Sequence, residues 1–159
     1  MKIDKLFNGL KHIANGDYVL EGDLISEETI EIDLDDRFVV NGRIWAKKSI
    51  VVRYGIEAGC GIKAGCGIEA GCGIEAGWGI EAGEGIKAGC GIEAGEGIEA
   101  GEGIKTKTFI NARKRIFAGI SIYRTSKNCD KTIRCAELRN GEICYGDLTL
   151  TKEAQNDEG

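Results

Sequence analysis

The feature that most constrains the fold is a six-residue repeat between residues 55 and 105. The stretch reads GIEAGC GIKAGC GIEAGC GIEAGW GIEAGE GIKAGC GIEAGE GIEAGE GIK, and it holds 17 of the chain's 25 Gly residues. Ile occupies every sixth position from Ile56 to Ile104, and Ala follows two residues later from Ala58 to Ala100. A short fixed period of this kind marks a repeat architecture.

The alternation within each repeat predicts a short β-strand followed by a corner. Side chains alternate between two faces along a strand, so Ile and Ala should point inward and the Glu or Lys between them outward. The Gly-x-Gly segment should form the corner, because Gly tolerates the positive φ and the close backbone approach that a tight corner requires. Ile or Phe continues at the same spacing from Ile32 to Ile122, so the predicted strands extend beyond the Gly-rich tract.

A strand and a corner every six residues predict a parallel β-solenoid. Three sides per turn would give a triangular, 18-residue coil, with about five coils in a rod about 25 Å long. Two sides per turn would give a flattened, 12-residue coil. In the longer coil Lys63 lies against Glu81, but Glu57, Glu75 and Glu93 form a like-charge column. Directly opposed like charges cost only tenths of a kcal/mol, so the sequence leaves both coils open.

The flanking residues predict caps on an all-β, single-domain solenoid. Apolar residues from Ile3 to Ile13 recur at helical spacing and end at the turn signal Asn15-Gly16, which predicts a short helix. Asn140-Gly141 between two alternating stretches predicts a β-hairpin. The expected division is a helical N-terminal cap over 1–16, the solenoid over 17–124, a hairpin cap over 125–151 and a polar tail over 152–159.

Two resemblances to known families accompany the period. The six-residue Ile spacing resembles the hexapeptide repeat of left-handed parallel β-helix proteins, which include many acyltransferases. That resemblance implies an enzyme with a His on the solenoid, whereas the single His here is His12 and the small inward residue comes two, not four, positions after Ile. Residues 38–52, FVVNGRIWAKKSIVV, are similar to the repeats of bactofilin-like polymer-forming proteins, which implies a right-handed β-helix. The handedness stays open.

The sequence does not carry the residues expected of an enzyme or a cofactor protein. It has no GxSxG, P-loop or HExxH arrangement, and the Gly-x-Gly matches belong to the repeat. The seven Cys include no CxxC pair, which argues against a zinc site. The odd Cys count, together with the absence of an apolar leader and of a long apolar run, predicts free thiols in a cytoplasmic protein. We therefore expect no enzyme activity, cofactor, metal or membrane contact.

Charge is strongly segregated along the chain, whose formal net charge is −5. Residues 55–105 carry nine acidic against three basic residues, whereas residues 106–139 carry nine basic against two acidic ones. We expect a rigid acidic rod that docks on a basic groove of a protein partner, for example as an inhibitor or a nucleic-acid mimic, with an exposed Trp as an anchor. The candidate interaction residues are Glu57, Glu75, Trp78, Glu81, Glu84, Glu93, Glu96, Glu99, Glu102, Arg113, Lys114 and Arg115.

Two other functions stay open at this point. The bactofilin-like stretch implies self-assembly through the solenoid ends. Separately, the basic stretch could contact the acidic tract of a second copy head to tail, and either contact would give a homo-oligomer. The basic residues of 105–139, interleaved with Phe109, Phe117 and Tyr123, could bind a nucleic acid directly. The protein partner is favoured over the nucleic acid.

Overall fold

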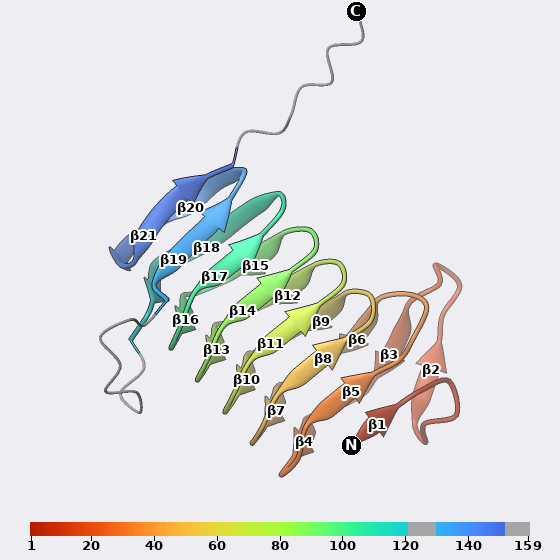
Figure 1. Ribbon diagram of the computed structural model, residues 1–159. Coiled ribbons are helices and arrows are strands. Elements are labelled where there is room, and N and C mark those ends of the chain that lie inside the picture. Colours follow the sequence, from red (N-terminus) through yellow and green to blue (C-terminus); the bar gives the residue numbers. More distant parts are fainter. Residues whose placement is uncertain (121–129, 152–159) are drawn as a thin grey trace, which may run out of the picture.

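The computed structural model describes residues 1–120 and 130–151. These residues form an all-β parallel β-solenoid of about seven turns, in which the strands stack side by side from the N-terminal to the C-terminal end (Figure 1). The expected number of about five coils was too low, because strand columns extend the stack at both ends of the regular repeat. The described residues contain no helix.

The strands are short and evenly spaced within the regular repeat. Most contain three residues, which are an inward residue, an outward residue and a second inward residue. Their bounds are β1 Lys2–Ile3, β2 Leu10–His12, β3 Tyr18–Leu20, β4 Leu24–Ser26, β5 Ile30–Ile32, β6 Phe38–Val40, β7 Ile44–Ala46, β8 Ile50–Val52, β9 Ile56–Ala58, β10 Ile62–Ala64, β11 Ile68–Ala70, β12 Ile74–Ala76, β13 Ile80–Ala82, β14 Ile86–Ala88, β15 Ile92–Ala94, β16 Ile98–Ala100, β17 Ile104–Thr106, β18 Phe109–Ala118, β19 Thr132–Cys135, β20 Glu137–Tyr145 and β21 Asp147–Leu150.

The strands form three columns, which we call faces 1, 2 and 3. Face 1 contains β3, β6, β9, β12, β15 and the first half of β18, and face 2 contains β4, β7, β10, β13, β16 and the second half of β18. Face 3 contains β1, β5, β8, β11, β14, β17, β19 and β21. The long strand β18 passes from face 1 to face 2 and thereby joins them into one sheet, and β20 runs beside it.

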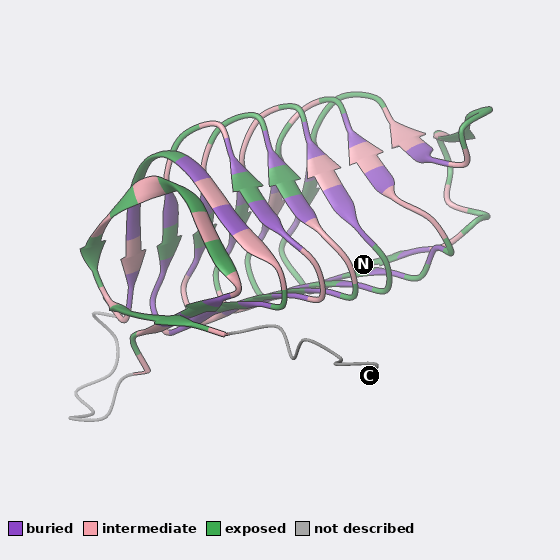
Figure 2. Ribbon diagram, turned by 90° about the horizontal axis from the view of Figure 1, so that it is seen from above, coloured by how far each residue is buried: buried purple, intermediate pink, exposed green. Residues whose placement is uncertain are grey.

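The strand register establishes the triangular, 18-residue coil. Ile62 pairs with Ile80 and Ile74 pairs with Ile92, in both cases one such coil later in the chain, which excludes the 12-residue alternative. The inward Ile and Ala side chains of the regular coils are at most 3% exposed and form one continuous core. Buried and exposed residues therefore alternate along the strands (Figure 2).

The six-residue spacing holds through Ile110 and Ile116 but is interrupted at its N-terminal end, contrary to the expectation of an unbroken period. Ile30, not Ile32, pairs with Ile50, so the first coil is two residues longer than the regular coils. At the other end Ile133 pairs with Ile104 and continues the column on face 3. Ile122, the last position of the expected period, lies outside the described residues.

The corners of the regular repeat need Gly for close approach rather than for positive φ. No Gly between Gly55 and Gly103 has positive φ, so that part of the expectation was wrong. An ideal Cβ built on Gly95 would lie 1.9 Å from the Gly77 carbonyl oxygen in the coil below. The absence of a side chain at this position therefore lets consecutive coils stack closely.

The expected N-terminal helix is wrong. Strand β1 pairs parallel with β5, and β2 pairs antiparallel with β3. The helical spacing would place Ile3 and Leu6 on one buried face, yet Ile3 is fully buried in the core and Leu6 is 93% exposed. The turn expected at Asn15-Gly16 is confirmed, since Gly16 has φ 98° and its N–H donates to the Ile13 carbonyl at 3.0 Å.

The C-terminal segment continues the parallel coil instead of forming the expected hairpin. Strand β20 runs through Asn140-Gly141 and pairs parallel with β18, and no antiparallel pair joins its two halves within the described range. Gly141 has φ 122° at a position where the register of β20 against β18 is irregular. Leu138 and Ile143 pack on the end of the core. The last turn of the solenoid therefore covers the core itself. The polar tail, 152–159, lies outside the described residues.

Candidate functional site

A regular series of ion pairs, which we call the charge ladder, joins acidic side chains of the first coil to basic side chains of the second coil. Acidic residues of the first coil lie beside basic residues of the second coil that follow one turn later in the chain. The ion pairs are Asp17–Arg37 at 2.8 Å, Asp23–Arg43 at 2.9 Å, Glu27–Lys47 at 2.9 Å, Glu28–Lys48 and Asp33–Arg53 at 3.2 Å. This end of the rod thus satisfies most of its own acidic charge.

The next three coils place nine outward side chains in three rows around the corner that joins faces 1 and 2. Strand register aligns the residues on the two faces, and backbone hydrogen bonds of 3.1 Å from Trp78 to Cys60 and from Glu96 to Trp78 align those at the corner. Trp78, which is 61% exposed, occupies the centre. We call this surface the Trp78 grid; its rows are Glu57, Cys60 and Lys63, then Glu75, Trp78 and Glu81, then Glu93, Glu96 and Glu99.

Only part of the acidic charge of the Trp78 grid is neutralised. Glu75, Glu93 and Glu99 make no ion pair with another residue in the described part of the chain. The pKa of Glu75 is raised, mainly because the carboxyl group is partly desolvated and also because Glu57 and Glu93 lie on either side of it. The neutralised members form the pairs Glu57–Arg37 at 2.8 Å, Glu81–Lys63 at 2.7 Å and Glu96–Lys114 at 2.7 Å.

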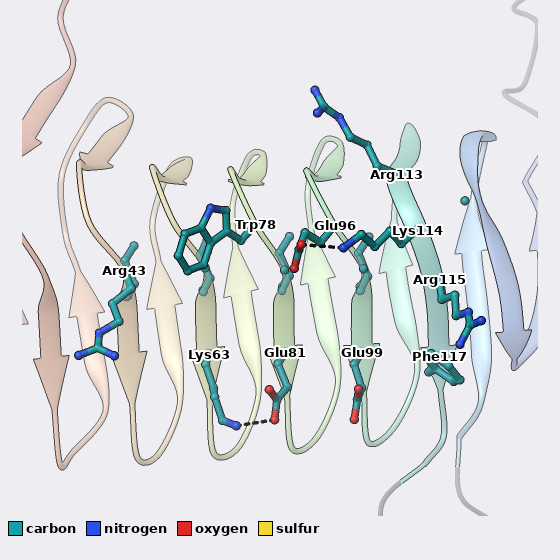
Figure 3. Close-up of a pocket in the computed structure, with 18 of the residues that line it drawn as sticks. Arg43, Lys63, Trp78, Glu81, Glu96, Glu99, Arg113, Lys114, Arg115 and Phe117 are labelled. Carbon is teal, nitrogen blue, oxygen red and sulfur yellow. Dashed lines mark hydrogen bonds and ion pairs between the residues drawn. The ribbon is translucent and has the colours of Figure 1, made fainter.

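A groove of about 930 Å³ runs along face 2 beside the Trp78 grid. Figure 3 shows Trp78 at its upper border and the Lys63–Glu81 ion pair at its lower border. Trp45 and Phe117 lie on the same face in different coils, and each adds half-buried aromatic surface to the groove. The groove therefore combines apolar rings with both signs of charge.

The sequence-predicted interaction residues fall into three places. Seven belong to the Trp78 grid, and Arg113, Lys114 and Arg115 lie on the adjoining corner of β18, where the Lys114 N–H donates to the Glu96 carbonyl at 3.1 Å. Glu84 and Glu102 lie on a different corner, which joins faces 2 and 3. The structure thus brings ten of the twelve candidates to one side of the rod.

Sequence reasoning missed the residues that complete the groove on face 2. Trp45 pairs with Lys63, and Phe117 pairs with Glu99, each one coil away. The missing information was the coil length. Once the 18-residue coil is known, positions 45, 63, 81, 99 and 117 fall in one column.

The basic stretch does not form one surface. Lys105 and Arg134 lie side by side on face 3, whereas Arg113 to Arg115 lie at the corner between faces 1 and 2. Arg139 lies over the Phe109 ring at 3.6 Å. Tyr123, Arg124 and Lys127 lie outside the described residues. The described basic residues of this stretch therefore lie on at least two sides of the rod.

Of the described cysteines, four lie at corners of the coil, whereas Cys135 lies on β19 and Cys144 on β20. Cys72 and Cys90 stack on consecutive coils with their Sγ atoms 3.0 Å apart, as the 18-residue coil predicts. Within 1–120 and 130–151, no group of three or more His, Cys, Asp or Glu side chains is arranged to hold a metal ion. No helix long and apolar enough to cross a membrane occurs in the same residues.

The fold and surface together define a parallel β-solenoid with an exposed tryptophan set among carboxylates. The chain matches no protein-family model, no curated protein and no solved structure.

Proposed function

We propose that this chain is a non-enzymatic protein-interaction module that docks through the Trp78 grid. The partner would present a basic surface with an apolar recess for the indole ring. The observation that supports this is the 61% exposure of Trp78 at the centre of a surface with six Glu side chains. Exposed Trp residues are typical anchors of protein interfaces, and surrounding charges guide association with a complementary partner.

The distribution of ion pairs supports a role for the unpaired carboxylates. In the first two coils the chain pairs its acidic residues with basic residues one turn later. On face 1 it stacks Glu57, Glu75 and Glu93 in register instead. Like charges directly opposite each other destabilise a sheet by tenths of a kcal/mol. A cationic partner placed on this column would relieve that repulsion.

The stacked strands also favour binding at low entropic cost. Each coil is held to the next by backbone hydrogen bonds near 3.0 Å, so the backbone that carries the grid is already ordered before a partner arrives. A pre-organised surface loses less conformational entropy on association. Carboxylates repeated about every 4.8 Å along a rigid rod could occupy a basic groove that otherwise binds phosphates, which would make the protein an inhibitor or nucleic-acid mimic.

Affinity capture with matched variants tests this proposal. The variants are Trp78→Ala and the triple change Glu75→Gln, Glu93→Gln and Glu99→Gln, and the matched control is Glu21→Gln, Glu27→Gln and Glu31→Gln, which removes the same charge from the first coil. We expect a partner that binds the unmodified protein and the control, is lost with both grid variants, and binds more weakly as salt is raised.

Thermal denaturation of each variant distinguishes lost binding from lost folding. The grid variants should melt at or above the temperature of the unmodified protein, because they change only exposed side chains. If the control loses the partner as completely as the grid triple variant, or if Trp78→Ala binds normally, docking through the Trp78 grid is wrong.

Self-assembly through the C-terminal end is a second candidate. Tyr145, Leu148 and Leu150 are 47%, 40% and 57% exposed there. Strand β21 pairs with β19 alone, so its outer edge faces no further strand of the described chain. Open strand edges with apolar residues can pair with another copy. Light scattering over a concentration series should show growing particles for the unmodified protein and for Thr149→Lys, but not for Leu150→Lys; a constant monomer mass for the unmodified protein rules assembly out.

A further inference from the structure

Two thiols lie in contact at the corner that joins faces 3 and 1. Cys72 and Cys90 occupy the same position of consecutive coils, and their Sγ atoms are 3.0 Å apart. The Cys90 N–H donates to the Cys72 carbonyl at 3.1 Å, and the Cys72 N–H donates to the Tyr54 carbonyl at 2.8 Å. Backbone hydrogen bonds on successive rungs therefore hold the two side chains in register.

The surroundings leave both thiols accessible. Each side chain is half-buried and borders a hollow of about 270 Å³, which Tyr54 and Phe109 also line. The pKa of the Cys90 thiol is raised, mainly because the thiol is hydrogen-bonded to Cys72. One hydrogen bond joins the two sulfur atoms, and either thiol can be its donor.

The geometry fits a disulfide better than a metal site. Stacked strands lie about 4.8 Å apart, within the Cα separation of about 4.4–6.8 Å that disulfides span. The sulfur atoms need to approach by only about 1 Å to reach bonding distance. Two thiolates on a metal with bonds of about 2.3 Å would have to lie farther apart than this pair, and no third ligand lies beside them in the described residues.

The other described cysteines have no sulfur neighbour of this kind. Cys60 lies between Gly42 and Trp78 in its corner column, and Cys66 lies between Lys48 and Glu84. Of the remaining two, Cys135 is buried and Cys144 is exposed on β20. The contact is therefore particular to one pair of coils.

We propose that Cys72 and Cys90 form a reversible redox modification site. Hydrogen peroxide oxidises one thiol to a sulfenic acid and releases one water molecule. The second thiol, as the thiolate, attacks that sulfur; the S–S bond forms, the S–O bond breaks, and the hydroxide leaves with the thiol's proton as a second water. Two thiols and one peroxide thus give one disulfide and two waters. Two molecules of a reducing thiol such as glutathione then restore both cysteine thiols by exchange and become glutathione disulfide.

The disulfide would join two adjacent coils in the middle of the rod. It closes a loop of one 18-residue coil, and the chain-entropy argument gives a melting temperature raised by about 5–10 °C at most. Because the corner borders face 1, oxidation would hold the coils that carry Glu75 and Glu93 together.

Peptide mapping of oxidised protein tests the proposal. The folded, reduced protein is treated with one equivalent of hydrogen peroxide, its remaining thiols are alkylated, and it is digested after Glu. We expect the peptide 70–75 to be linked to 85–93, lighter by two hydrogen atoms than the sum of the two and released by dithiothreitol. The variant Cys60→Ser with Cys66→Ser should still form the link and gain thermal stability on oxidation, whereas Cys90→Ser should do neither.

Several outcomes would overturn the assignment. Full alkylation of both cysteines after oxidation of the folded protein would contradict it, as would sulfinic acid in place of the link. Linkage of either cysteine to another position, or to a second chain, would do the same. Oxidation in urea serves as the reference for unselective pairing, and equal yields of the 72–90 link in the folded and unfolded protein would show that the stacked geometry has no influence.

Discussion

Replacing Asp17 by Asn tests whether the charge ladder stabilises the N-terminal coils. The Asp17 residue is only 7% exposed, and its carboxylate accepts hydrogen bonds from Arg37 Nη2 at 2.8 Å and from Asn15 Nδ2 at 2.9 Å. The hydrogen bond from Arg37 is the main cause that lowers the pKa of Asp17. Glu27, whose side chain is 71% exposed in its ion pair with Lys47, provides the matched control from the same ladder.

The expected magnitude lies between that of a surface pair and that of a fully buried pair. Breaking a buried ion pair costs about 3–5 kcal/mol, and hydrogen bonds to charged groups contribute about 1.5–3 kcal/mol. The Arg37 side chain is 43% exposed and keeps its ion pair with Glu57 at 2.8 Å, so solvent and Glu57 compensate in part. We expect Asp17→Asn to cost about 1–2 kcal/mol, or about 3–6 °C in Tm, and Glu27→Gln to cost about 0–0.5 kcal/mol.

Thermal denaturation followed by circular dichroism at pH 7 and in acid measures both the size and the origin of this effect. Because the folded pKa of Asp17 is lowered, its contribution is present above the ordinary value of 3.8 and is lost as pH falls through the folded value. The Tm difference between the unmodified protein and Asp17→Asn should therefore shrink in strong acid. The reasoning is refuted if Asp17→Asn melts like Glu27→Gln at pH 7, or if the gap is unchanged in acid.

Three further perturbations test the column of carboxylates, the last turn and the corners. Because the pKa of Glu75 is raised in the folded protein, its ionised form destabilises the fold above that pKa. Glu75→Gln should therefore raise Tm slightly at pH 7 and leave Tm unchanged near pH 3. A lower Tm at pH 7 would contradict this. The pKa of Asp130 is lowered to about 2, mainly by Lys105, so its stabilisation should disappear as pH falls from 3.8 towards 2, and Asp130→Asn should speed hydrogen exchange in β19. An added Cβ would lie 1.9 Å from a backbone oxygen at Gly95 but 3.6 Å at Gly73, so Gly95→Ala should lower Tm by several degrees more than Gly73→Ala, and equal melting would disprove the close-approach argument.

The regular coils were predictable because one short pattern repeats without conflict. Ile62 and Ala64 point inward and the residue between them points outward, as strand alternation requires. The number of sides per coil was not predictable, because 12- and 18-residue coils present the same pattern to the core. That choice depends on which strands pair, such as Ile62 with Ile80, and pairing is a tertiary property.

The two ends show why local signals failed outside the repeat. The spacing of Ile3 and Leu6 is typical of a helix, yet the open edge of face 3 offers β1 backbone partners on β5 and a buried site for Ile3. Asn140-Gly141 is a hairpin signal, yet Leu138 and Ile143 instead continue the inward columns above Ile110 and Ile116. In both cases burial on an existing stack outweighs a local preference.

The candidate site was predictable in its residues but not in its arrangement. Trp78 and the Glu positions are recognisable as outward residues from the repeat alone. Their grouping around one corner, and the presence of Trp45 and Phe117 on the same side, required the 18-residue register. A column through Trp45, Lys63 and Glu81 cannot be seen in the linear sequence, because its members are a full coil apart.

The positions of the lysines argue that the acidic column on face 1 is not imposed by the fold. The outward slot between Ile and Ala accepts Glu or Lys, and Lys63 on face 2 and Lys87 on face 3 each make an ion pair with a Glu on the neighbouring rung. A Lys at position 75 would face Glu57 and Glu93 in the same way. The chain instead has Glu at position 75, with its raised pKa. A charge that the isolated rod leaves unpaired, three residues before an exposed Trp, is what a surface needs if its counter-charge belongs to another protein.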